Sequence, residues 1–249
     1  MIIIKNKLAI ERMKVAGHKL ATIFDRLSVF IKEGTTTLFL DATIEKFLRE
    51  EGLRSECKGY GGYKHVSCIS VNDEVVHGVP SLKQIKLGDL VKVDVCASWQ
   101  GYCADMARCF SVGPMSPEIQ KFVAIAQESL DVGIKKMYAG NKLGDISHAV
   151  QQVIEGAGYG VVKDFAGHGI GKKMHEEPEL LNYGDSGTGP TLRSGMAFAI
   201  EPMITLGSYE VYITEDKWTV KTEDGSIAAH VEDTVLITEN GPEILTRLT

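Results

Sequence analysis

The sequence predicts an α+β fold in which two similar halves share one sheet, and three observations support this prediction. Two helical segments precede a group of strand-like segments, and the same order then occurs a second time. A shift of 106 residues aligns Gly34 with Gly140 and Gly52 with Gly158, glycines that follow corresponding segments. No linker-like composition separates the halves. We therefore predict one domain over residues 1–249, with halves at roughly 7–112 and 116–238.

The first half begins with two helices. From Leu8 to Ile31 apolar residues recur at helical spacing, and Gly34 follows the run. The stretch TTTLFLDATIEKFLREEG predicts a second helix, with Thr35 to Thr37 as cap candidates and Gly52 as its end. Strand-like segments follow at Val66–Val71, Glu74–Val76, Asp89–Ser98 and Tyr102–Val112.

The second half repeats this order after the turn sequence GPMSP. One helix is predicted from Ser116 and Glu118 to Tyr138, and another from Asn141 to Gly156. Strands are then predicted at Val161–Phe165, Ala197–Ile204, Trp218–Thr222 and Val231–Thr238.

Composition and charge narrow the class of protein. The 249 residues are 44% apolar and 24% charged, with a formal charge of −6, which disfavours a nucleic-acid partner. The N-terminal stretch MIIIKNKLAIERMK lacks the features of a signal peptide, and no apolar run is long enough to cross a bilayer. The five cysteines are odd in number and lack C-x-x-C spacing. We expect a cytoplasmic protein with reduced thiols and no membrane contact.

The hairpin VKVDVCASWQGYCAD carries two aspartates in strands that otherwise read as buried. A four-residue loop at Ser98–Gly101 would place Asp94 and Asp105 opposite each other on one face. Like charges in that position repel, so a buried pair needs a cation between the side chains. An exposed edge hairpin with solvated aspartates explains the same pattern, and the hairpin alone does not choose between the two.

Three further segments favour the explanation that a cation lies between the two aspartates. His168 stands between glycines in FAGHGIG, Glu201 ends the apolar stretch AFAI, and Glu232 lies in the apolar stretch AAHVEDTVLI. A turn histidine and a structural ion pair are the simpler explanations, but buried carboxylates without partners are costly. Together with Asp94 and Asp105 these residues offer four carboxylates and one imidazole. That set offsets two divalent cations and suits cobalt, manganese, iron or zinc. Two such ions lower the pKa of a shared water and polarise a carbonyl.

Two more histidines are candidates for the same site. His77 lies in EVVHGVP, and His175 lies in KKMHEEPELL, where the H-E-x-x-H signature fails because Glu179 holds its last position. A histidine near an activated water can donate to the substrate carbonyl or to the developing oxyanion. Their alternative interpretation is two surface imidazoles.

The order and spacing of several segments resemble those of type I methionine aminopeptidases, which are pita-bread metallopeptidases, across nearly the whole chain. The matching segments are GYGGYKHVSCISVNDEVVHGVP, GDLVKVDV, GYCADMARCF, GHGIGKKMHEEP, GMAFAIEPM, DKWTVKT and AAHVEDTVLIT. The resemblance implies a pseudo-two-fold antiparallel sheet with helices on its outer face. It also implies an aminopeptidase that removes the initiator methionine when the next residue is small, through a water activated by two metal ions.

The resemblance also assigns roles to residues. It implies that the metal ligands are Asp94, Asp105, His168, Glu201 and Glu232, with Asp105 and Glu232 bridging the ions and Glu201 also moving a proton. His77 and His175 would position the scissile amide and contact the substrate. A pocket for the methionine side chain, here called the methionine pocket, would consist of Cys57, Tyr60, Tyr63, Cys68, Met174 and Trp218. Sulfur atoms and aromatic edges make favourable contacts with a thioether.

Four positions depart from the usual family pattern without removing a ligand: Lys64, Met106, Met174 and Ala199. They bear on metal preference and pocket shape. The partners implied are nascent polypeptides that begin with Met, and the ribosome exit region, for a monomeric enzyme. Two alternatives remain open. An Xaa-Pro peptidase shares all five ligands but usually carries a large N-terminal domain, and a non-catalytic peptide- or RNA-binding module is expected to lose ligands.

Overall fold

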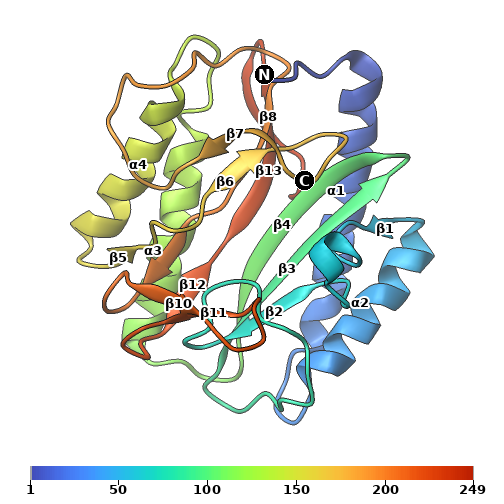
Figure 1. Ribbon diagram of the computed structural model, residues 1–249, viewed down its shortest axis with the longest axis vertical. Coiled ribbons are helices and arrows are strands. Elements are labelled where there is room, and N and C mark those ends of the chain that lie inside the picture. Colours follow the sequence, from blue (N-terminus) through green and yellow to red (C-terminus); the bar gives the residue numbers. More distant parts are fainter. Residues whose placement is uncertain (1, 249) are drawn as a thin grey trace.

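The centre of the molecule is a nine-stranded sheet, seen in a computed structural model that describes residues 2–248 (Figure 1). Its strands follow the order β1-β3-β4-β13-β8-β6-β7, with β2 beside β3 and β14 beside β13, and all its pairings are antiparallel. The bounds are Arg54–Ser55 (β1), Cys68–Val71 (β2), Leu90–Trp99 (β3), Tyr102–Ser111 (β4), Gly167–Gly169 (β6), Glu176–Leu180 (β7), Ala197–Ile200 (β8), Glu232–Thr238 (β13) and Gly241–Ile244 (β14).

Two small sheets accompany the large one. The first pairs β10 with β11, and the second has the order β12-β9-β5. Their bounds are Gly160–Val161 (β5), Met203–Thr205 (β9), Val211–Ile213 (β10), Val220–Thr222 (β11) and Ala228–His230 (β12). None of the described helices is long and apolar enough to span a membrane.

Four helices form where sequence periodicity predicted them: α1 (Lys7–Leu27), α2 (Thr37–Glu51), α3 (Pro117–Ile134) and α4 (Leu143–Gly156). Short 3₁₀ turns follow α1 at Ser28–Phe30 and precede β2 at Tyr60–Gly62. The Thr36 side chain caps α2 by accepting from the Phe39 amide, and Ser116 caps α3 by accepting from the Ile119 amide. Gly52 ends α2 in the left-handed conformation, with φ of 67°, which glycine adopts without strain.

Each helix pair covers the strands of its own half on the same side of the sheet, as Figure 1 shows. Helices α1 and α2 bury apolar side chains against β2, β3 and β4, while α3 and α4 do so against β8 and β13. Side chains alternate along a strand, so Val93 and Val95 of β3 join the helix-side core while Asp94 faces the other way. Asp94 and Asp105 thus lie on the opposite face of the sheet.

The hairpin of β3 and β4 is tighter than the sequence suggested. Trp99 pairs with Tyr102 across a two-residue turn, so the expected four-residue loop is wrong. Gln100 and Gly101 both have positive φ, 48° and 78°, the conformation that matches the right-handed twist of paired strands. Asp94 consequently pairs with Ala107 and Asp105 with Cys96, so the aspartates are diagonal neighbours on one face rather than direct partners.

Four other strand predictions need correction. The segment Glu74–Val76 forms only an isolated bridge between Glu74 and Lys221. The predicted strand Ala197–Ile204 is divided into β8 and β9 at Glu201 and Pro202. Pro202 cannot donate a backbone hydrogen bond, which agrees with a break at this point. Of the segment Val161–Phe165, only Val161 lies in a strand, β5. Of the segment Trp218–Thr222, only Val220–Thr222 (β11) is a strand.

Candidate active site

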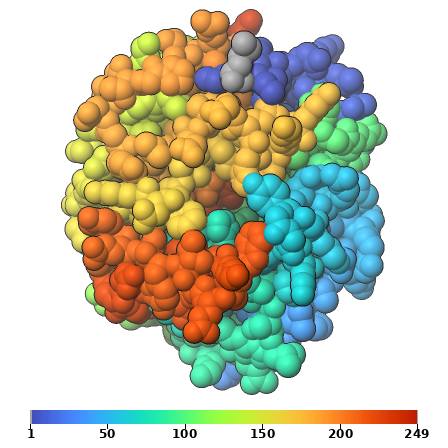
Figure 2. All heavy atoms as spheres, in the orientation of Figure 1, coloured from blue at the N-terminus to red at the C-terminus, as the bar shows by residue number. Residues whose placement is uncertain are grey.

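The five predicted ligands come from five neighbouring strands of the large sheet. Their strands follow one another in the order β3, β4, β13, β8 and β6. Four of the residues lie within these strands and Glu201 directly follows β8. All five line one central cavity of about 1070 Å³ on the face away from the helices. Figure 2 shows this cavity as a hollow near the middle of the molecule, bordered by segments of both halves.

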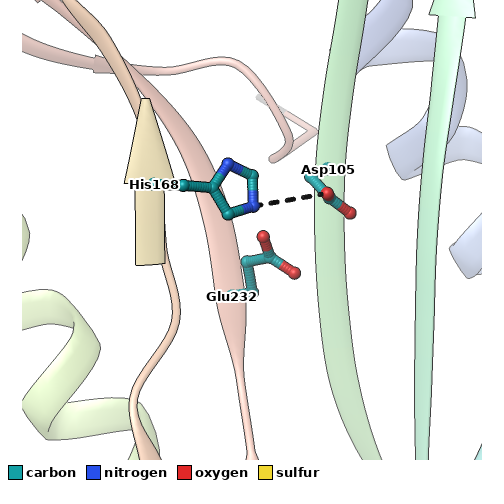
Figure 3. A group of neighbouring side chains, drawn as sticks. All are labelled: Asp105, His168 and Glu232. Atoms are coloured by element: carbon teal, nitrogen blue, oxygen red, sulfur yellow. Dashed lines mark ion pairs between the residues drawn. The ribbon is translucent and has the colours of Figure 1, made fainter. Parts of the chain in front are cut away.

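Three of these side chains are close enough to share one ion. Oxygen and nitrogen atoms of Asp105, His168 and Glu232 all lie within 4.8 Å of one another (Figure 3). His168 Nε2 is 3.9 Å from Asp105 Oδ2 and 3.6 Å from Glu201 Oε1. Only 5% of Asp105, 8% of His168 and 2% of Glu232 is exposed. The group therefore combines a high density of ionisable side chains with little access to water.

Burial shifts the pKa values of all four carboxyl groups upward. Burial and then the neighbouring Glu201 raise the pKa of Asp105 to about 7, and burial raises that of Glu201 to about 8. The pKa values of Asp94 and Glu232 are also raised, first by burial and then by the charge of Asp105. Without added positive charge, the folded chain holds several of these groups protonated near neutral pH.

Buried carboxylate oxygens without hydrogen-bond partners indicate whether these residues suit metal ions. Among the described residues, Asp105 Oδ1 and Glu232 Oε1 are buried without any hydrogen-bond partner. Buried acceptors are almost always satisfied, so orphaned carboxylate oxygens beside a histidine are suited to hold a cation. Oxygen ligands with one nitrogen match the hard-to-intermediate divalent ions. The residues present therefore fit the metal ions that the family resemblance implies.

Hydrogen bonds hold the aspartate-bearing strand against its neighbour. Thr234 Oγ1 accepts from the Asp105 amide and donates to the Asp105 carbonyl, both at 2.8 Å. On the opposite face of the sheet, Arg108 donates to the Glu232 carbonyl and to Asp233 Oδ1. These contacts join β4 to β13 at the point where both strands supply a carboxylate. Sequence reasoning did not identify them, because they depend on which strands become neighbours.

The two predicted donor histidines lie in the same cavity. Burial lowers the pKa of His77 to about 4, and it also lowers the pKa of His175. His77 packs edge-on against Phe165, with ring centroids 5.6 Å apart. His175 Nδ1 is 3.0 Å from the Tyr60 hydroxyl, and its ring lies edge-on to His168 at 4.4 Å. Neutral imidazoles in these positions can donate hydrogen bonds without adding charge.

The residues of the methionine pocket also line the cavity, on one side of the carboxylates. Cys57, Tyr63 and Cys68 are buried in an apolar cluster, against which Met174 and Trp218 pack. The Tyr63 and Trp218 rings are 4.9 Å apart. Burial raises the pKa values of Cys57 and Cys68, so both thiols stay protonated, which agrees with an apolar lining.

Two side chains outside the prediction anchor this lining. Asp41 of α2 accepts from the amides of Val66 and Ser67, on the segment that leads into Cys68. Lys5 Nζ is 2.7 Å from Glu176 Oε2, and both side chains are buried. Glu176 directly follows His175, so this pair attaches the N-terminal segment to a cavity-lining residue. The sequence alone did not show that Lys5 pairs with a residue so distant in the chain.

The four departures from the family pattern have different positions. Lys64 is exposed. Met106 lies in the helix-side core, away from the cavity. Ala199 is buried in β8, where it pairs with His168 on one side and Thr234 on the other. Met174, which belongs to the methionine pocket, is the one departure that lines the cavity. Only Met174 can therefore change the shape of the cavity directly.

His230 is a residue of this site that sequence reasoning missed. It is the last residue of β12, two positions before Glu232, and its Nε2 lies 3.4 Å from Glu201 Oε2. The sequence contained a signal for His230, because a polar residue two positions before Glu232 in an extended segment can point to the same face of the sheet. The break between β12 and β13 at Val231 made that signal hard to interpret.

Known proteins with similar sequences and structures identify the family of this chain. The signature of metallopeptidase family M24 matches residues 11–239. A methionine aminopeptidase of Clostridium acetobutylicum is 47% identical over 247 residues, which cover 99% of each chain. The crystal structure of methionine aminopeptidase from Thermotoga maritima matches all of both chains with a TM-score of 0.98 at 43% identity.

A second kind of relative shares the fold at lower identity. An Xaa-Pro dipeptidase from Bacillus anthracis gives a TM-score of 0.80 at 26% identity, over 99% of this chain and 62% of that one. The antiparallel sheet with helices on one face is common to both kinds of relative. The family match over most of the chain and the end-to-end similarity to curated relatives lead to one conclusion: this chain belongs to metallopeptidase family M24 and has the pita-bread fold.

Proposed function

We propose that this protein is a metal-dependent aminopeptidase that removes an N-terminal methionine when the next residue is small. The observation that carries the proposal is the convergence of ligand-type side chains from five neighbouring strands in one buried cavity, with carboxylate oxygens left unpaired. The similarity to methionine aminopeptidases over the whole chain gives independent support.

Two divalent ions are proposed to occupy this site. The side chains that would hold them are Asp94, Asp105, His168, Glu201 and Glu232. When bound, the ions lower the pKa of water and polarise the peptide carbonyl. The unpaired oxygens of Asp105 and Glu232 support this assignment, since each of these residues offers one buried oxygen without a partner.

The chain's own residues are proposed to move one proton and to stabilise one charge. Glu201 takes a proton from the attacking water as the water oxygen bonds to the carbonyl carbon, and gives it to the amine nitrogen when the C–N bond breaks. His77 and His175 donate hydrogen bonds to the carbonyl oxygen as negative charge develops on it. Their lowered pKa values support this role, because both imidazoles are neutral donors near pH 7.

The methionine pocket supports the proposed selectivity. Its thiols, aromatic rings and Met174 give a polarizable, mostly apolar surface beside the carboxylates, which suits a thioether better than a charged or strongly polar side chain. Nascent polypeptides that begin with Met are therefore the proposed substrates. We further propose that the enzyme acts as a cytoplasmic monomer and approaches the ribosome exit region.

Peptide hydrolysis by metal-reconstituted protein tests this function. Met-Ala-Ser, Met-Leu-Ser and Ala-Pro would be compared after separate reconstitution with iron(II), manganese, cobalt and zinc, and calorimetry would count the ions. We expect Met-Ala-Ser to be the preferred peptide, and Glu201→Gln to reduce its hydrolysis at least ~100-fold. Preference for Ala-Pro would instead support the Xaa-Pro peptidase alternative. Full activity of Glu201→Gln would contradict the proposed role of this residue.

A further inference from the structure

His230 is buried beside the carboxylates, and its Nε2 makes no hydrogen bond within residues 2–248. Only 1% of the residue is exposed, and its Nε2 is among the buried atoms without a hydrogen bond in the described residues. Its backbone is committed elsewhere, since β12 pairs with β9 through His230 and Met203, and the His230 carbonyl accepts from Cys109 Sγ. The main chain at His230 is therefore fixed, and the imidazole is enclosed beside Glu201.

The nearest acceptor identified for this nitrogen is Glu201. His230 Nε2 lies 3.4 Å from Glu201 Oε2, while the other oxygen of the same carboxylate, Oε1, lies 3.6 Å from His168 Nε2. Glu201 thus stands between two imidazoles that contact different oxygens. One oxygen faces a predicted ligand, and the other faces a residue outside the predicted ligand set.

The backbone contacts of Glu201 do not fix the orientation of its carboxylate. Glu201 follows the end of β8 and precedes Pro202, so its neighbour cannot donate a backbone hydrogen bond. Its own carbonyl accepts from Asn182 Nδ2 at 3.0 Å, which anchors the main chain only. The orientation of the carboxylate therefore depends on what its two oxygens meet.

We propose that His230 is a positioning residue for the site, which donates its Nε2 hydrogen to Glu201 Oε2 and keeps Glu201 Oε1 directed toward His168. This inference rests on the proposed role of Glu201 as ligand and proton carrier. A carboxylate that ligates a metal commonly needs a second hydrogen-bonding partner to fix its orientation.

Paired substitutions can separate positioning from packing. His230→Gln places an amide nitrogen near the position of Nε2, whereas His230→Asn keeps an amide that is too short to reach Glu201. His230→Leu removes the polar group at similar bulk. His148→Leu is the matched control, because His148 is a partly buried histidine of α4 whose Nδ1 bonds the Gly184 carbonyl, outside the central cavity.

The measurements are cobalt(II) affinity by calorimetry, the visible spectrum of the cobalt protein, kcat and KM for Met-Ala-Ser, and thermal unfolding of the metal-free protein. We expect His230→Leu and His230→Asn to weaken cobalt binding and lower kcat by roughly 10–100-fold, with a changed spectrum and little change in KM. His230→Gln should stay within a few-fold of the natural protein. His148→Leu should leave cobalt affinity and spectrum unchanged.

The inference is overturned if the Asn and Gln variants behave alike, whether both are normal or both are impaired, and this comparison remains available if the Leu variant does not fold. Glu201→Gln distinguishes this failure from a failure of the proposed function. If Glu201→Gln is impaired while His230→Asn is normal, the role of His230 alone is wrong. If Glu201→Gln binds cobalt and turns over peptide normally, both proposals are wrong.

Discussion

The buried position of Asp105 disfavours the ionised form of its carboxyl group. Its Oδ1 is buried without a hydrogen bond, and burial together with the adjacent Glu201 raises its pKa to about 7. In metal-free protein, ionising this group therefore costs free energy in the folded state and not in the unfolded state. Residues that serve a site in this way commonly lower the stability of the fold that contains them.

We predict that Asp105→Asn makes the metal-free protein more stable by roughly 1–3 kcal/mol at pH 8, because it removes a buried charge. A raised acid pKa means that the folded state binds more protons than the unfolded state between about pH 4 and 7. Across that range the stability of the natural protein falls, relative to the variant, as the pH rises, and then the difference levels off. Chemical unfolding in the presence of a chelator measures this difference.

Added metal should reverse the order of stability, so that the natural protein becomes more stable than Asp105→Asn. Added manganese stabilises the natural protein by mass action, whereas Asp105→Asn has lost a ligand and gains less. Asp185→Asn, at an exposed position, is the matched control and should leave stability unchanged both without and with metal. A variant that is less stable than the natural protein without metal would show that Asp105 is not under electrostatic strain.

At the scale of elements, Asp145 illustrates how a helix start is stabilised. It lies in the first turn of α4, where its carboxylate accepts from the Lys142 amide at 2.7 Å, the Ser186 hydroxyl at 2.6 Å and the Gly187 amide at 2.7 Å. The hydrogen bond from Ser186, followed by those from the backbone, lowers its pKa to about 2. One side chain thus joins α4 to the loop before β8.

Asp145→Ala should therefore destabilise the fold by about 1 kcal/mol at pH 7, the usual cost of a lost helix cap. Because the pKa is lowered in the folded state, this contribution is complete above about pH 4 and is lost as the pH falls toward 2. Urea unfolding of both proteins between pH 7 and pH 3 measures the difference. A difference in unfolding free energy that stays constant as the pH falls would contradict the proposed contribution of the ionised Asp145.

The sequence was most informative for elements with local signals. Helices α1 to α4 were predicted because apolar periodicity and caps such as Thr36 and Ser116 are local properties. The strand Gly167–Gly169 was not, because three residues carry no periodic pattern and this strand exists only through its neighbours β7 and β8. The register of the β3–β4 hairpin depended in the same way on a turn conformation that the residue types do not determine.

The site shows the same division between local and distant information. Every residue predicted for it lines the central cavity, since charged side chains in apolar strands and the family resemblance mark them individually. His230 and Lys5 were missed because each matters through a partner far away in the chain, Glu201 and Glu176 respectively. Their functional roles remain predictions that the experiments above address.

At the scale of the whole molecule, the candidate ligands join the two helix-covered halves. Asp94 and Asp105 come from β3 and β4, whereas His168, Glu201 and Glu232 come from the second half. The two helix-side cores are separate clusters of buried residues. Ions bound between these side chains would thus connect parts of the chain that otherwise pack around different cores.

Metal binding is accordingly predicted to slow hydrogen exchange in both halves at once. Exchange would be followed by mass spectrometry with and without added manganese, on peptides that cover β3–β4 and β8–β13. We expect slower exchange in both regions because local opening of either half would break ligand contacts. Protection confined to one half would mean that the ions do not connect them.

The position of the N-terminal segment has a practical consequence for handling the protein. Ile3 borders the central cavity, and Lys5 anchors that segment beside His175. Leu248, near the other end of the chain, instead lines a separate cavity between α1 and α3, on the helix-covered face. A dye, affinity tag or surface linker attached before Ile3 would emerge beside the entrance for peptides. Attachment after Leu248 keeps such groups away from it.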